Sequence, residues 1–219
     1  MRVERCFAFV DLSGFTAFTE HYGDEQTVVV LASFRTRVRE VAARRGVRVT
    51  KWLGDGAMLS SGDTPAVASM VLELAALVPD EVPLEIRAGL AQGAVIMFEG
   101  DDYIGRATNV ASRLCDAAAP GEVLATREVS SRVPRWATVG EPQLYPAHGF
   151  DRPLEASLLQ IGTGDVMVTD PCCGLSLPAV AGLETRFGSD NTVERFCSTA
   201  CALSWEQSHK SPQALAPLI

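Results

Sequence analysis

The chain has 219 residues with a formal net charge of −8, and 47% of its residues are hydrophobic. This length suits one domain with a small appendage, and the composition excludes a disordered or collagen-like chain. The acidic balance argues against binding along a nucleic-acid backbone, and no stretch approaches the ~20 apolar residues of a membrane span. The N-terminal apolar run is too short for a signal peptide, so we expect a cytoplasmic protein in a reducing compartment.

The first half of the chain predicts a strand, a helix and a hairpin. Residues 5–11 form a short apolar and aromatic run typical of a buried strand. Apolar residues then recur every three or four positions, which predicts an amphipathic helix that ends before Gly46. Its expected apolar face is Val28, Leu31, Phe34, Val38 and Val41. Residues 47–52 alternate as a strand does, and Asp55 between two glycines predicts a hairpin tip.

The elements that follow alternate between helix and strand. We expect a long strand over 84–98, where Gly89 and Gly93 indicate a bulge or a close approach of backbones. The remaining expected elements are helices at 65–77 and 106–116, a strand at 121–125, then a short helix and strand-like pieces to about 161. This order predicts an α+β sandwich: a sheet with antiparallel strands and helices packed on one face.

Two acids stand at strand ends, each beside glycine. Asp11 precedes a Ser-Gly turn and a helix start, and Asp55 occupies the hairpin tip. If the first strand lies beside the hairpin, the two carboxylates converge, and such a pair suits two hard cations and a triphosphate. Backbone amides after a glycine turn at a helix start would bind anions. Either Asp alone reads equally well as a turn or cap residue, so the pair carries the signal.

Four segments in order resemble those of class III nucleotidyl cyclases, and together they cover about residues 6–161. They are FVDLSGFT (9–16), KWLGDGAM (51–58), RAGLAQG (87–93) and DYIGRATNVASRL (102–114). The resemblance implies a ferredoxin-like α/β sandwich and an adenylyl cyclase that converts ATP to cyclic AMP and pyrophosphate at a homodimer interface. The alternative is a weakly active or inactive nucleotide-binding regulatory module of the same fold. A diguanylate cyclase is set aside, because its hairpin would carry a different motif.

The resemblance also implies a role for each matching residue. Asp11, Asp55 and the carbonyl of Leu12 would hold two Mg²⁺ or Mn²⁺ ions in each active site. Lys51 and Asp102 would select adenine. The remaining roles fall to Asn109 on the ribose, Arg113 on the α-phosphate, and the backbone amides of Gly14, Phe15 and Thr16 on the phosphates. Arg87 is a further candidate for binding the phosphates, and equally a candidate structural residue of its strand. Because the family draws the metal-binding carboxylates from one subunit, and the purine-selecting pair, the Asn and the Arg from its partner, two copies of this chain would complete two sites.

One position departs from the family. A Lys-Gly pair near the end of that domain reaches the phosphates, and here the corresponding residues are His148 and Gly149. A neutral His would bind the triphosphate less well than Lys, which would lower the activity or make it depend on pH.

The C-terminal region has a different composition. We expect a catalytic domain over 1–161, a linker over 162–168, a Cys-bearing module over 169–210 and a flexible tail over 211–219. The segments DPCCGL (170–175) and RFCSTACALSW (195–205) resemble the YHS-type metal-binding domain. The resemblance implies Zn²⁺ on Cys173, Cys197 and Cys201 with a fourth ligand from elsewhere, His209 being one candidate. The alternative is a reduced-cysteine module without metal or one with a redox-sensitive disulfide.

Overall fold

The computed structural model describes residues 1–99, 102–180, 182–188 and 192–209. The chain divides into two compact units, 1–161 and 162–219, and each is considered by itself. The expected flexible tail over 211–219 lies outside the described residues. Within the described residues, no helix combines the length and the apolar character needed to cross a membrane.

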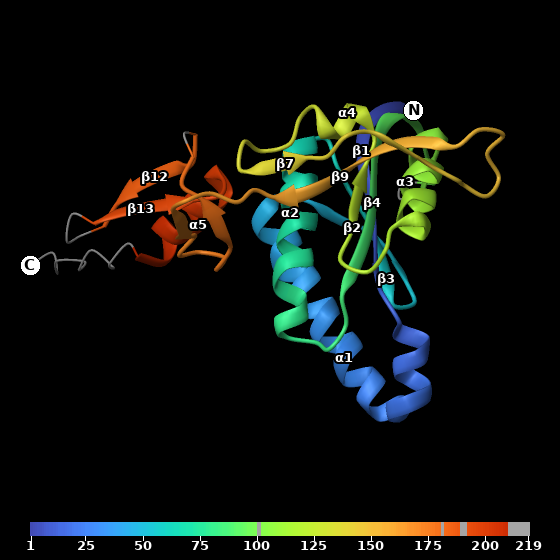
Figure 1. Cartoon of the computed structure of the whole chain (residues 1–219), viewed down its shortest axis with the longest axis horizontal. Coiled ribbons are helices and arrows are strands. Elements are labelled where there is room, and N and C mark those ends of the chain that lie inside the picture. Colours follow the sequence, from blue (N-terminus) through green and yellow to red (C-terminus); the bar gives the residue numbers. More distant parts are fainter. Residues whose placement is uncertain (100–101, 181, 189–191, 210–219) are drawn as a thin grey trace, which may run out of the picture. The chain divides into compact units, whose positions relative to one another are not determined.

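The first unit is one mixed sheet with helices against it (Figure 1). Its elements are β1 (Arg2–Leu12), α1 (Phe15–Arg45), β2 (Arg48–Leu53), β3 (Gly56–Ser61), α2 (Thr64–Leu77), the 3₁₀ turn η1 (Val78–Asp80), β4 (Ile86–Phe98), β5 (Asp102–Ile104), α3 (Arg106–Ala117), β6 (Val123–Ala125), α4 (Arg127–Ser130), β7 (Ala137–Val139), β8 (Gln143–Tyr145) and β9 (Leu154–Ile161). The strand order is β2-β3-β1-β4-β6-β9-β7, with β5 on β4 and β8 on β9. β4 and β6 are parallel, and the other pairs are antiparallel. The expected α+β class is confirmed.

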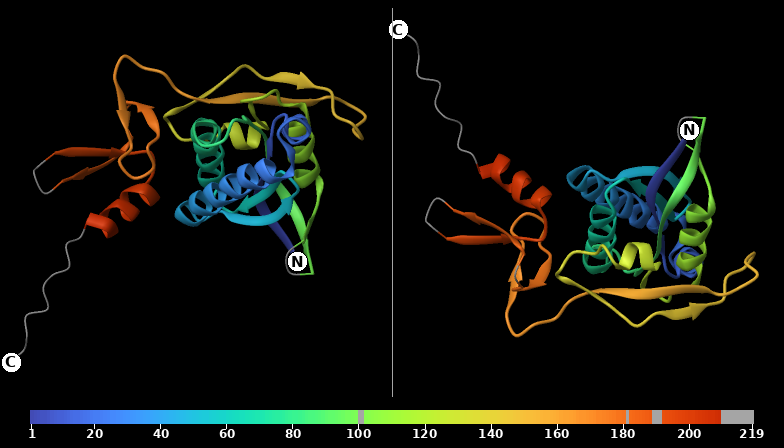
Figure 2. Two further views of the ribbon diagram at one scale, coloured as in Figure 1. Left: turned by 90° about the horizontal axis from the view of Figure 1, so that it is seen from below. Right: turned by 90° about the horizontal axis from the view of Figure 1, so that it is seen from above.

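The helices cover both faces of this sheet. Phe7 pairs with Ala91, and both belong to a core cluster that α3 completes with Ala107 and Leu114. The next residues along those strands face the other way, and there Thr64 of α2 donates to Gln92 of β4 at 2.7 Å. Figure 2 shows α2 and the part of α1 after its break at Gly23 on one side of the strands, and α3 on the other. The expectation that all helices pack on one face was wrong, because β1 is apolar on both of its faces.

The long helix α1 buries a slightly different stripe from the one expected. Val38 and Val41 are buried as predicted, but Val28 is 64% exposed and Thr27 takes its place in the buried stripe. At 100° per residue, seven positions before Phe34 return to nearly the same direction, whereas six positions point about 120° away. The helix ends at Gly46 in the left-handed conformation, with φ 65°, as the sequence predicted.

Gly89 marks a place where two backbones touch. A Cβ at this position would lie 2.2 Å from the carbonyl oxygen of Ala111 and 2.2 Å from the amide nitrogen of Cys115 on α3. The register between β1 and β4 runs without a shift past Gly89. Of the two expectations for this glycine, close approach is therefore the correct one, and it seats α3 on the sheet.

The second unit consists of two short hairpins and a helix. β10 (Met167–Thr169) pairs with β11 (Ser176–Pro178), and β12 (Glu184–Phe187) pairs with β13 (Val193–Phe196), before α5 (Thr199–His209). The expected linker over 162–168 overlaps β10 by its last two residues. Leu175, Leu177, Phe196 and Ala202 are almost fully buried and give this unit a small core of its own.

Candidate active site and cysteine cluster

The strand register brings Asp11 and Asp55 to the same edge of the sheet. Asp11 is the penultimate residue of β1 and pairs with Gly56, the residue that follows Asp55 after the β2–β3 turn. A Cβ on Gly56 would lie 2.6 Å from the carbonyl oxygen of Val10 and 3.1 Å from Oδ1 of Asp11. Only glycine at position 56 therefore lets the hairpin approach the first carboxylate so closely.

The two carboxylates interact electrostatically. Burial raises the pKa of Asp55 above its ordinary value, and the negative charge of Asp11 raises that pKa further. A divalent cation between such groups would relieve both the repulsion and the lost solvation. Carboxylate and carbonyl oxygens are the donors that Mg²⁺ and Mn²⁺ prefer, so Asp11, Asp55 and the Leu12 carbonyl fit these ions chemically.

Arg87 on β4 provides a cation at Asp11. Its Nε and Nη2 donate to Oδ2 of Asp11 at 3.0 and 2.6 Å, and Nη1 approaches the carbonyl oxygen of Asp116 at 3.5 Å. The hydrogen bond to Asp11 raises the pKa of Arg87 above its ordinary value. The guanidinium thus neutralises a carboxylate that any metal ion at this edge would also need.

The start of α1 is arranged as an anion site. Gly14 is in the left-handed conformation, with φ 78°, and no side chain caps the helix that begins at Phe15. The amides of the first helical turn, including those of Phe15 and Thr16, have no partner inside the helix. Such amides point at an incoming anion, and they lie directly after Asp11 and Leu12 in the chain.

Lys51 and Asp102 meet although they are far apart in sequence. Nζ of Lys51 on β2 donates to Oδ1 of Asp102 on β5, and both side chains are about half exposed. The structure therefore brings together the two residues that the resemblance assigns to the purine ring. Because the pair is accessible, a ligand could exchange its own hydrogen bonds for this contact.

Asn109 and Arg113 lie one turn apart on α3. Asn109 is exposed, and Arg113 donates to Oδ2 of Asp116 at 2.6 Å. Asn109 lines a cavity of about 640 Å³ together with Arg106 and residues 149–153. His148 lines an adjoining cavity of about 380 Å³, and the two cavities share residues 150–153. His148 and Asn109 therefore border the same loop. Neither Asp11 nor Asp55 lines either of these two cavities.

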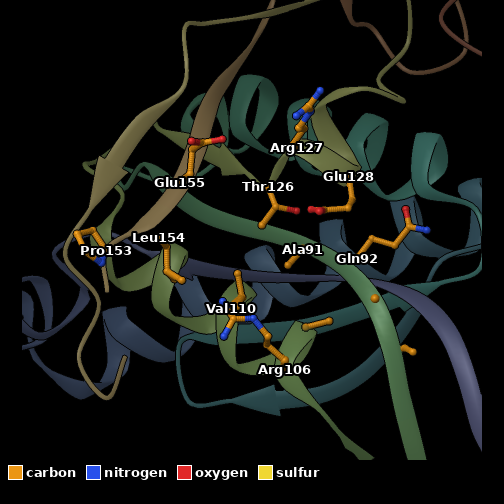
Figure 3. Close-up of a pocket in the computed structure, with 13 residues that line it drawn as sticks. Ala91, Gln92, Arg106, Val110, Thr126, Arg127, Glu128, Pro153, Leu154 and Glu155 are labelled. Carbon is orange, nitrogen blue, oxygen red and sulfur yellow. The ribbon is translucent and has the colours of Figure 1, made fainter. Parts of the chain in front are cut away.

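A further cavity of about 490 Å³ opens between β4, α3, α4 and β9 (Figure 3). Arg106 belongs to its wall and to that of the cavity at Asn109. None of the residues to which the resemblance assigns a role lines this cavity.

The second unit gathers three thiols and a carboxylate. One donor atom from each of Asp170, Cys173, Cys197 and Cys201 lies within 4.8 Å of the other three. Sγ of Cys197 is 3.9 Å from Sγ of Cys173 and 3.5 Å from Sγ of Cys201. Three thiolates with one oxygen donor form a tetrahedral set that suits Zn²⁺. The structure thus brings together the three cysteines that the sequence selected.

Asp170 is the member of this cluster that the sequence analysis missed. Its side chain is fully buried and accepts backbone hydrogen bonds from Cys172 at 2.8 Å, Cys173 at 3.3 Å and Cys197 at 2.8 Å. The carboxylate therefore joins the two segments that carry the thiols. His209, the expected candidate for the fourth ligand, is not in the cluster and instead stacks on Trp205, with ring centroids 4.4 Å apart.

Comparison with known proteins gives a consistent result. The family model of the adenylate and guanylate cyclase catalytic domain matches residues 3–140. An uncharacterized protein of Mycobacterium tuberculosis is 35% identical over 149 residues, which are 68% of this chain and 39% of that protein. An adenylate cyclase of Streptomyces coelicolor is 35% identical over 117 residues, 53% of this chain and 30% of that protein. The chain spans less than half the length of these relatives.

The fold matches solved structures as well. The adenylyl cyclase CyaB from P. aeruginosa superposes with a TM-score of 0.66 at 26% identity, covering 76% of this chain and 98% of that chain. Its match to most of the chain, at nearly the full length of the neighbour, confirms the expected sandwich of the nucleotidyl cyclase type.

Proposed function

This chain belongs to the family of adenylate and guanylate cyclase catalytic domains, and from that premise we propose that it is an adenylyl cyclase. It would convert ATP to 3′,5′-cyclic AMP and pyrophosphate. The observation that favours ATP over GTP is the contact between Lys51 and Asp102. An ammonium can donate to N1 of adenine, and a carboxylate can accept from the 6-amino group. Guanine reverses the donor and acceptor at those two positions, so the same pair would reject it.

The closeness of Asp11 and Asp55 at one edge of the sheet supports the metal-dependent part of the proposal. Asp11, Asp55 and the Leu12 carbonyl would hold two Mg²⁺ or Mn²⁺ ions, which would lower the pKa of the ribose 3′-hydroxyl and neutralise triphosphate charge. The amides of the first turn of α1 would bind the phosphates from the same side. Arg87 would turn from Asp11 to a phosphate oxygen, because its guanidinium already lies at this edge.

The helix α3 supplies the groups for the other half of the site. Asn109 would orient the ribose, and Arg113 would stabilise charge that develops on the α-phosphate. His148 would contact the triphosphate less effectively than a lysine. Since the cavity at Asn109 is lined by neither Asp11 nor Asp55, we propose that a second copy of the chain completes each site in a homodimer.

Turnover of ATP and GTP with Mg²⁺ or Mn²⁺ tests this proposal, with the cyclic product identified by mass. We expect cyclic AMP, and its loss in Asp11→Ala. Mixing Asp55→Ala with Arg113→Ala protein should restore part of the activity, because one mixed site then contains both intact halves. A folded dimer that forms no cyclic product from either nucleotide would instead favour a regulatory nucleotide-binding module, and His148→Lys would then be the first variant to assay.

For the second unit we propose a zinc site on Cys173, Cys197 and Cys201. The mutual approach of these thiols and Asp170 supports it. Metal analysis of the purified full chain should find about one equivalent of Zn²⁺, and Cys197→Ser should lose it. Cys172→Ser is the matched control, because its thiol lies in the same segment but outside the cluster. Absence of copurified metal, with a Cys197–Cys201 disulfide in its place, would support the redox alternative.

A further inference from the structure

A side chain of α1 holds the turn that carries Asp55. Nη2 of Arg35 donates to the carbonyl oxygen of Gly54 at 2.8 Å. Arg35 also lies over the ring of Trp52 on β2, with Cζ 5.0 Å from the ring centroid. A charged donor makes a stronger hydrogen bond than a neutral one, so this contact is well suited to hold a turn in place.

The accepting carbonyl belongs to the peptide that leads into Asp55. Gly54 has φ 67°, a left-handed conformation that glycine adopts without strain. Because the Gly54 carbonyl shares one rigid plane with the amide nitrogen and Cα of Asp55, holding the carbonyl also holds the position of the Asp55 Cα, and only rotation about the bonds of Asp55 itself stays free on this side. On the other side of the turn, Gly56 is held by its pairing with Asp11.

We propose that Arg35 is a positioning residue that aims the Asp55 carboxylate at the Asp11 edge. The inference rests on the metal-binding role proposed above for Asp55. The segment α1 then contributes at both carboxylates: its first helical part starts just after Asp11, and its second part, after the non-helical Gly23, carries Arg35 to the turn of Asp55. Removing a hydrogen bond made to a metal ligand itself costs roughly 10–100-fold in metal affinity. Arg35 acts on the peptide next to the ligand, so the lower end of that range is expected.

Arg39 provides a matched control one helical turn further along. Its Cζ lies 5.1 Å from the same Trp52 ring, so it has the charge and the stacking contact of Arg35. Among the described residues, Arg39 has no hydrogen bond to the turn. A purely electrostatic role of Arg35 would change the metal affinity in the opposite direction from a positioning role. Removal of a nearby positive charge would tighten cation binding, whereas loss of positioning weakens it.

The test is Mn²⁺ affinity of the full chain without nucleotide, measured from the electron paramagnetic resonance signal of free Mn²⁺. Arg35→Ala should weaken Mn²⁺ binding about tenfold, whereas Arg39→Ala should change it less than about twofold. Arg35→Lys keeps the charge and a donor, and it should fall between wild type and Arg35→Ala. In steady-state assays, Arg35→Ala should raise the KM for Mn²⁺ more than the KM for ATP. Thermal unfolding of each variant checks that the fold is intact.

Two results would overturn the inference. One is Mn²⁺ binding by Arg35→Ala that equals or exceeds wild-type binding; the other is equal weakening in Arg39→Ala. If Arg35→Ala does not fold, Arg35→Lys and Arg39→Ala decide in the same way. A wild-type chain that binds no Mn²⁺ contradicts the metal site and this inference together. A chain that shows the Arg35 effect but forms no cyclic nucleotide contradicts only the proposed activity.

Discussion

Arg87 and Asp11 form a two-bond ion pair across neighbouring strands, with Nε and Nη2 of Arg87 donating to the same oxygen at 3.0 and 2.6 Å. The pair lies at the edge of the sheet where the hairpin tip with Asp55 ends. If Asp11 holds a metal ion as proposed, the same carboxylate would have two competing uses, as partner of Arg87 and as ligand of the added cation.

This competition gives opposite effects on metal and nucleotide. Arg87→Gln should tighten Mn²⁺ binding without nucleotide by about fivefold, because the metal no longer displaces a guanidinium at a half-exposed site. The same variant should raise the KM for ATP, because it removes the guanidinium that we propose turns to a phosphate oxygen. A Mn²⁺ titration and steady-state kinetics measure the two effects. Weaker Mn²⁺ binding in Arg87→Gln would contradict the competition.

The contact between Lys51 and Asp102 predicts the purine preference. Replacing both, as Lys51→Glu with Asp102→Ser, presents an acceptor to the N1 and 2-amino edge of guanine and removes the acceptor for the 6-amino group. We expect kcat/KM for ATP to fall at least about 100-fold and the ratio of GTP to ATP turnover to rise. Mass identification of the cyclic product from each nucleotide checks this. An unchanged ratio in a folded double variant would contradict the assignment.

Gly89 should be the least replaceable glycine of β4. A Cβ there would overlap backbone atoms of α3, and these cannot move aside as the end of a flexible side chain can. Gly89→Ala should lower the free energy of unfolding by about 3 kcal/mol or more. Gly93→Ala is the control on the same strand face, since its Cβ would lie 3.4 Å from the Ala107 methyl group, and it should cost less than about 1 kcal/mol. Urea denaturation measures both, and equal losses would contradict the backbone contact.

Two thiols of the first unit should be inert in the folded protein. Burial raises the pKa of Cys6 and that of Cys115 to about 12, so at pH 8 only about one molecule in ten thousand has a thiolate at either position. Iodoacetamide should leave both unmodified in the native chain and alkylate both in urea. Peptide mapping by mass spectrometry measures the labelling. Native-state alkylation of either thiol at the rate of an exposed cysteine would contradict this.

The hairpin and the first strand were predictable because their signals are local. A short apolar run predicts a strand, and Asp55 between glycines predicts a tip, so the convergence of the two acids needed only the pairing of neighbouring elements. The cysteines of the second unit were selected through the resemblance of their two segments to the YHS-type domain.

Other features depend on packing between segments that are remote in sequence. Val28 fits a spacing rule of three or four residues, but the contact of α1 with its neighbours selects the stripe through Thr27 instead. The position of Asp170 among three thiols, and the distance of His209 from that cluster, depend on how two hairpins and a helix pack.

The sequence by itself determined the order of the elements, the glycine turns, the residues that carry charge at the strand ends, and the resemblance to nucleotidyl cyclases. The tertiary structure alone decided that α3 covers the face of the sheet opposite to α2. It also decided that Arg87 pairs with Asp11 and that Arg35 donates to the Gly54 carbonyl before Asp55. The physical reason is that periodicity and turn chemistry act within a few residues. Tertiary packing decides which face of the sheet a helix covers. It also decides which side chain reaches a carbonyl or carboxylate that is distant in sequence.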